Sequence, residues 1–127
     1  MRLVEQLRAP GGCPWDRAQT HATLVPYVIE EAYEVVEAIE GGRDQKCCEE
    51  LGDLLLQIVL HAQLAGERGA FSIEDVLAGI IAKMLRRHPH VFGGEHALDA
   101  EGVLQNWERW KQEEQAEQEG IEATEEK

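Results

Sequence analysis

Two clusters of acidic residues interrupt the most apolar part of the sequence, and they constrain the fold more than any other feature. Residues 28–61 read VIEEAYEVVEAIEGGRDQKCCEELGDLLLQIVLH. A charged side chain in apolar surroundings is costly unless it has a partner. Arg43 and Lys46 are the only lysine or arginine residues in this stretch. These two bases cannot balance the six clustered acids, so most of the charge compensation must come from elsewhere; the acids are Glu30, Glu31, Glu34, Glu49, Glu50 and Asp53.

The stretch predicts an antiparallel helical hairpin. Apolar residues recur at helical spacing on both sides of Gly41-Gly42, which predicts helices over residues 21–40 and 45–67. The glycine pair ends the first helix because glycine tolerates left-handed geometry, and Asp44 is suited to cap the second. A connection this short makes the helices antiparallel neighbours. The apolar residues that recur at helical spacing in the first helix are Val25, Val28, Ala32, Val35, Val36 and Ile39.

The remaining segments predict an all-α fold, with two or three helices added to the hairpin. Ser72 and Asp75 stand in a capping-box arrangement at the start of one of them. Prolines and glycines break the intervening segments into loops. No segment alternates as a strand does. Further helices are predicted at residues 1–8, 73–87 and 100–117, with loops at 9–20 and 88–94.

Length and charge limit the classes of partner. We expect one domain over residues 1–115, followed by an acidic tail, 116–127, that is a frayed helix end or disordered. The net charge of -13 disfavours binding to a nucleic acid polymer, which relies on lysine and arginine. No apolar run is long enough to span a membrane, and the N-terminus lacks the pattern of a signal peptide. A cytoplasmic location is therefore expected.

The second hairpin helix is apolar nearly all round, which indicates burial on most sides. One face carries six apolar residues, while Leu56, Leu60 and Leu64 point elsewhere. A chain this short cannot easily surround such a helix. We therefore predict a homodimer, or a higher oligomer, whose four-helix-bundle-like core is completed across the subunit interface. The six residues of the first face are Leu51, Leu54, Leu55, Ile58, Val59 and Ala62.

Helical phase separates the acidic residues into two groups. Each residue advances a helix by about 100°, so residues three or four apart share a face. Glu31 and Glu34 fall beside the apolar side of the first helix, whereas Glu30 points further away. Glu50 and Asp53 occupy the corresponding edge of the second helix. Converging carboxylates either take up protons, with raised pKa values, or bind a hard divalent cation such as Mg²⁺. A solvated acidic face is the third interpretation.

Basic and aromatic residues elsewhere are suited to hold a phosphate chain and a base. Lys83 and Arg87 are four residues apart on one predicted helix, and Trp107 and Lys111 repeat that spacing on another. Lys46, one turn before Glu50, could join them. The alternative is that these lysine and arginine side chains merely extend along a core helix. Trp15 and Trp107 offer flat surfaces for a nucleobase, although a tryptophan is more often a core anchor.

A zinc site is a weaker alternative. His88 and His90 flank Pro89, and neutral imidazoles suit Zn²⁺. No second pair of ligands occurs at regular spacing, and Pro89 explains the local sequence without a metal. Neither a Walker loop nor a Rossmann fingerprint is present.

The ordered motifs of this chain resemble those of the MazG family of nucleoside triphosphate pyrophosphohydrolases. That family has E-E-x-x-E followed by E-x-x-D, and here the motifs read EEAYE at residues 30–34 and ELGD at 50–53. The resemblance includes GGCPWDRAQTH, KMLRRHPHVFGG and NWERWKQEE, and spans about residues 1–115. One departure is that longer family members carry two such domains in tandem, whereas this chain carries one.

The resemblance implies an all-α intertwined dimer that requires Mg²⁺, with Mn²⁺ as a substitute. It implies hydrolysis of nucleoside triphosphates to monophosphate and pyrophosphate, as in cleansing of the nucleotide pool. Glu30 would be a general base, a second-metal ligand or an outer group. Two alternatives are a hydrolase restricted to one deoxynucleotide and a non-catalytic, metal-stabilised dimer that binds nucleotides or regulates. By position, the implied metal ligands are Glu31, Glu34, Glu50 and Asp53, and the implied substrate contacts are Lys46, Lys83, Arg87, Trp107 and Lys111.

Overall fold

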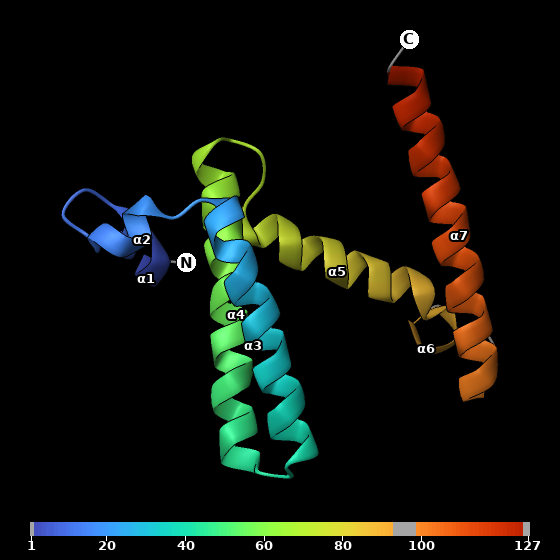
Figure 1. Ribbon diagram of the computed structural model, residues 1–127. Coiled ribbons are helices and arrows are strands. Elements are labelled where there is room, and N and C mark those ends of the chain that lie inside the picture. The colour runs from blue at the N-terminus through green and yellow to red at the C-terminus, as the bar shows by residue number, and fades with distance from the viewer. Residues whose placement is uncertain (1, 93–98, 126–127) are drawn as a thin grey trace. The chain divides into compact units, whose positions relative to one another are not determined.

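The computed structural model describes the backbone of residues 2–92 and 99–125, in which every regular element is a helix (Figure 1). The all-α prediction is thereby confirmed for the described residues. The chain divides into two compact units, Met1–Leu77 and Ala78–Lys127. A single domain over residues 1–115 stays a prediction. Among the described helices, none has the length and apolar character needed to cross a membrane.

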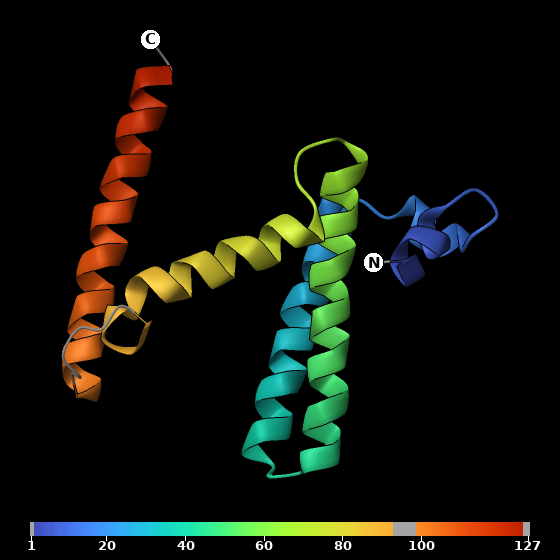
Figure 2. The same cartoon turned by 180° about the vertical axis from the view of Figure 1, so that it is seen from behind.

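The first unit is built on the predicted hairpin. Helices α3 (His21–Glu40) and α4 (Asp44–Glu67) lie side by side and antiparallel in both views (Figures 1 and 2). Gly42 has a φ of 68°, the left-handed geometry expected at this turn. The cap prediction for Asp44 was wrong by one position: Asp44 is the first residue of α4, and Arg43 occupies the N-cap without a side-chain bond.

The core lies at the open end of the hairpin. Val4 of α1 (Arg2–Arg8) and Leu24 are fully buried against Val59 and Leu60. Of the six apolar residues that recur at helical spacing on α3, only Val35 is buried within this chain. The reason is geometric: α4 covers one side of α3, and most of the stripe faces away from it. The exposed members include Val25, Val36 and Ile39.

A short helix replaces part of the predicted loop over residues 9–20. Helix α2 (Pro14–Ala18) forms because proline is well suited to the first helical turn, where its missing N–H costs nothing. Gly12 brings the chain close to the end of α1. A Cβ at Gly12 would lie 2.4 Å from the carbonyl oxygens of Gln6 and Leu7, so only glycine fits there without movement.

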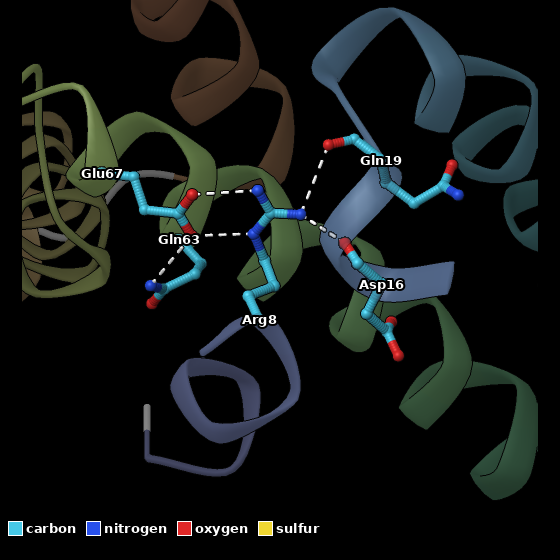
Figure 3. Close-up of polar contacts among 5 residues, drawn as sticks. All are labelled: Arg8, Asp16, Gln19, Gln63 and Glu67. Carbon is cyan, nitrogen blue, oxygen red and sulfur yellow. Dashed lines mark hydrogen bonds and ion pairs between the residues drawn. The ribbon is translucent and has the colours of Figure 1, made fainter. Parts of the chain in front are cut away.

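Arg8 fastens α1 and α2 to α4 (Figure 3). Its guanidinium donates to both carboxylate oxygens of Glu67, at 2.7 and 2.9 Å. It also donates to the backbone carbonyls of Asp16 and Gln19, the latter at 3.3 Å. Gln63 donates to the same carboxylate at 3.2 Å. These contacts hold α2 at a defined place beside the hairpin, and the pKa of Glu67 falls below its ordinary value because of the bond from Arg8.

Two histidines face each other across the hairpin. Their rings are stacked, with centroids 5.0 Å apart, and His21 Nδ1 lies 2.7 Å from His61 Nδ1. One nitrogen must therefore carry the proton and donate to the other. Burial, and then the neighbouring His21, lower the pKa of His61. The folded state thus favours the neutral form of His61.

Helix α5 (Ile73–Arg87) begins in the first unit and ends in the second. The predicted capping box is confirmed: Asp75 N–H donates to Ser72 Oγ at 3.2 Å, and Ser72 N–H donates to the Asp75 carboxylate at 2.8 Å. Of the predicted loop 88–94, Pro89–Phe92 forms the single turn α6, and residues 93–94 lie outside the described residues. Helix α7 (Ala100–Glu125) extends beyond its predicted end at residue 117.

Candidate metal centre and nucleotide site

Three carboxylates from the hairpin gather at one place. Glu31 comes from α3, and Glu50 and Asp53 come from α4. One ligand oxygen of each lies within 4.8 Å of the others, the only such group of three or more potential ligands among the described residues. The i, i+3 spacing places Glu50 and Asp53 on one face of α4, and antiparallel packing brings Glu31 to that face. The helical-phase argument predicted this convergence.

The surroundings of the group favour a positively charged ligand. Glu50 is only 4% exposed, Glu31 is half-buried and Asp53 is exposed. Desolvation, followed by the negative charge of Asp53 and Glu50, raises the pKa of Glu31. Oxygen donors of this kind match the preference of Mg²⁺ and Mn²⁺ for hard ligands. The donor set therefore fits the divalent cation that the sequence predicted.

Lys46 provides part of the charge compensation. Its Nζ lies 2.8 Å from Glu50 Oε1, one turn along α4. That bond raises the pKa of Lys46, as does the negative charge of Glu50. Lys46 and Arg43 also line a hollow of about 430 Å³ together with Glu34. From the sequence, Lys46 was predicted only as a phosphate contact, although its i, i+4 spacing from Glu50 indicates the ion pair.

The other acidic residues of the motifs lie around this group. Glu34 is half-buried and is not among the three gathered carboxylates, although its charge contributes to the raised pKa of Glu31. Glu30 and Glu49 are exposed, as their helical phase suggests. Glu34 as a ligand and Glu30 as a base stay predictions.

An exposed aromatic pair lies on the same unit. Trp15 of α2 meets Tyr27 of α3 edge to face, with ring centroids 5.8 Å apart and an interplanar angle of 83°. Trp15 is 48% exposed and Tyr27 is 38% exposed. From the sequence, Trp15 and Trp107 were predicted as surfaces for a nucleobase, and Tyr27 was not. Tyr27 was missed as a partner because the distance between α2 and α3 depends on contacts such as those of Arg8.

The four other predicted substrate contacts, Lys83, Arg87, Trp107 and Lys111, all belong to the second unit. Arg87 and Arg86 both pair with Glu114, which lowers the pKa of that carboxylate. Trp107 is half-buried, and His88 approaches its ring edge-on with centroids 5.2 Å apart.

The zinc alternative gains no support from the second unit. His88 Nδ1 donates to the backbone carbonyl of Met84 at 2.6 Å, which is a structural contact within the chain. The rings of His88 and His90 have centroids 5.5 Å apart. Within residues 2–92 and 99–118, no set of three potential ligands includes either histidine.

The described helices place the chain among all-α proteins whose helical hairpin carries a carboxylate group that could hold a metal ion. Comparison with known proteins identifies the family. The profile of the MazG nucleotide pyrophosphohydrolase domain matches residues 19–92. The chain therefore belongs to the MazG family. This confirms the resemblance drawn from its motifs.

Curated relatives and a solved structure agree with that family. A Thermotoga maritima protein named nucleoside triphosphate pyrophosphohydrolase/pyrophosphatase MazG is 60% identical over 91 residues, which cover 72% of this chain and 36% of that protein. The nucleoside triphosphate pyrophosphohydrolase of Escherichia coli (strain K12) is 47% identical over 117 residues, covering 91% of this chain and 44% of the relative. The chain thus spans less than half of either relative.

The crystal structure of a mazG-related protein from Thermotoga maritima matches with a TM-score of 0.70 and 25% identity. The match covers 87% of this chain and 95% of that one. The helical fold of the chain is therefore similar to that of a solved MazG-related protein.

Proposed function

We propose that this chain hydrolyses nucleoside triphosphates between the α- and β-phosphates, giving a nucleoside monophosphate and pyrophosphate. The observation that carries the proposal is the convergence of Glu31, Glu50 and Asp53, at the motifs that place the chain in the MazG family. Mg²⁺ is the proposed cofactor, with Mn²⁺ as a substitute. Cleansing of the nucleotide pool is the role that such an activity would serve.

The gathered carboxylates would hold the cation, with Glu34 as a further proposed ligand. When bound, a divalent cation neutralises phosphate charge and makes a nearby water more acidic. The burial of Glu50 limits its hydration, which strengthens its interaction with any cation. Lys46 would then hold a phosphate oxygen from the hollow that it lines with Arg43.

Other side chains would accept the proton, stabilise the phosphate charge and contact the nucleotide. The exposed carboxylate of Glu30 would accept the proton of the attacking water. Lys83, Arg87 and Lys111 would stabilise charge on the phosphate oxygens as it develops in the transition state. Trp107 would contact the nucleotide. These assignments rest on position in the family motifs.

We also propose that the active form is a homodimer. Support comes from large apolar side chains that are exposed on both hairpin helices. Isolated exposed leucines are normal, but this many along two adjacent helices are typical of an interaction surface. Sedimentation that finds a monomer at micromolar concentration would contradict this proposal. The residues concerned are Val25, Ile29, Val36, Ile39, Leu51, Leu55, Leu56 and Ile58.

Product identification tests the activity. ³¹P NMR would follow ribo-, deoxy- and oxidised nucleoside triphosphates with and without Mg²⁺. We expect monophosphate and pyrophosphate in the presence of Mg²⁺, and neither product with Glu50→Gln. The matched control is Glu49→Gln, which removes the neighbouring exposed charge and should retain activity. Release of a nucleoside diphosphate together with inorganic phosphate would contradict the proposal.

The same panel separates the two alternatives. Turnover of a single deoxynucleotide would identify a hydrolase restricted to one substrate. Nucleotide binding without any pyrophosphate release would identify a non-catalytic module, and the proposed activity would then be wrong.

A further inference from the structure

The pair formed by Trp15 and Tyr27 lies on the surface of the unit that carries the carboxylate group. Aromatic side chains that stack in the core are usually covered, yet about half of Trp15 and more than a third of Tyr27 remain exposed. Their edge-to-face contact, at 5.8 Å between centroids, holds the two rings nearly perpendicular. Such a pair presents one ring face and one ring edge to a ligand.

Hydrogen bonds to the backbone of residues 15–19 fix the position of Trp15. Gln19 Nε2 donates to the backbone carbonyl of Trp15 at 2.9 Å. The neighbouring carbonyls of Asp16 and Gln19 accept hydrogen bonds from Arg8, whose other end is anchored on Glu67 (Figure 3). The ring is therefore carried by a turn that is tied to α4, and little rotational freedom would be lost when a ligand stacks on it.

Tyr27 lies one helical turn before Glu31 on α3. Four residues of helix separate the two by about 6 Å along the axis. A separation of this size suits a ribose between a base on the ring pair and an α-phosphate near Glu31. The two groups share a face because their spacing is i, i+4.

We infer that Trp15 and Tyr27 form the platform on which the nucleobase of the substrate stacks. The inference rests on the proposed function, since it places the base of the same substrate. Stacking on an aromatic face is tolerant of sequence, because every base has a π-face. Purines offer more area than pyrimidines, so the platform favours purine nucleotides. Tyr27 acts by contact with the base and takes no part in the chemistry at the phosphate.

Binding measurements on Tyr27→Ala test the inference. Isothermal titration with Mg²⁺ would use two probes: α,β-methylene-ATP, which has a base and cannot be cleaved at the relevant bond, and inorganic tripolyphosphate, which has no base. Loss of one stacking partner should weaken the analogue about five- to 100-fold. Tripolyphosphate affinity should be unchanged. Tyr27→Phe keeps the ring and should bind both probes like the wild type.

A control variant and the oligomeric state make the test specific. Tyr33→Ala removes an exposed tyrosine from the same helix and should leave both affinities unchanged. Equal weakening of both probes by Tyr27→Ala would overturn the inference, as would unchanged analogue affinity. A shift in sedimentation together with lost affinity would overturn it as well, because the pair would then be a subunit contact. If the wild-type protein releases pyrophosphate while Tyr27→Ala gives any of these contradicting results, the proposed function still holds and only the inference fails.

Discussion

Replacing Arg8 with methionine tests whether one guanidinium holds the N-terminal helices on the hairpin. Methionine keeps much of the length of the side chain and removes every donor. The Arg8 side chain is only 10% exposed, whereas the Glu67 side chain is 39% exposed. The change would remove two charge-assisted bonds to Glu67 and two bonds to backbone carbonyls.

The expected loss in the free energy of unfolding follows from these contacts. Bonds to charged groups contribute about 1.5–3 kcal/mol, but water replaces part of that contribution at the exposed carboxylate. The two carbonyls lose buried donors and add a smaller penalty. We therefore expect Arg8→Met to lower the free energy of unfolding by about 2–4 kcal/mol. Urea unfolding followed by far-UV circular dichroism measures it, with the exposed Arg2→Met as control.

The pH dependence separates the ion pair from the backbone contacts. The bond from Arg8 holds the pKa of folded Glu67 below its ordinary value of 4.5. A carboxylate whose folded pKa is depressed contributes stability above its unfolded pKa and loses it as pH falls through the folded value. The difference between wild type and Arg8→Met should therefore shrink below about pH 4.5. A difference under about 0.5 kcal/mol at neutral pH would refute the reasoning.

Three further changes test other parts of the structure. Lys46→Met removes the ammonium group that is paired with Glu50. Titration should then show that Mn²⁺ binds about tenfold more tightly. Arg43→Gln should change Mn²⁺ binding less. His61→Phe should abolish a loss of thermal stability that the wild type shows as pH falls through about 6.5, because burial lowers the pKa of folded His61 and protonation then favours unfolding. An unaltered pH profile in this variant would contradict the assignment. Gly12→Ala places a Cβ against two carbonyl oxygens of α1 and should lower the free energy of unfolding, measured in urea, by at least about 2 kcal/mol. A change within about 0.5 kcal/mol would show that the turn adjusts to the added Cβ.

Local rules predicted the parts of the site that depend on one hairpin. The phases of Glu31, Glu50 and Asp53 follow from helical geometry, and a two-residue glycine turn permits only an antiparallel partner. Convergence of these residues could therefore be predicted before any coordinates. Glu34 shares the phase argument, yet lies outside the gathered group, because a helix edge is wide and phase alone does not give the distance between oxygens.

Local rules could not predict the contacts between segments that are distant in the sequence. The place of Trp15 depends on Arg8 and Glu67, which are 59 residues apart. The same applies to the burial of Val4 against Val59. The exposure of most of the apolar stripe of α3 has another cause. Apolar periodicity shows which side chains prefer to be covered, and says nothing about whether the covering surface belongs to the same chain. Exposure of Val36 and Ile39 is consistent with the proposed dimer.

The six acidic residues of the two clusters are not equivalent if, as we propose, Glu31, Glu50 and Asp53 form one divalent cation site. Electron paramagnetic resonance of free Mn²⁺ during titration tests it without any substrate. We predict that the wild type and Glu49→Gln bind Mn²⁺ alike, whereas Glu50→Gln binds at least tenfold more weakly. Equal weakening in both variants would show a diffuse acidic surface, and unchanged binding in Glu50→Gln would show that the cation binds elsewhere.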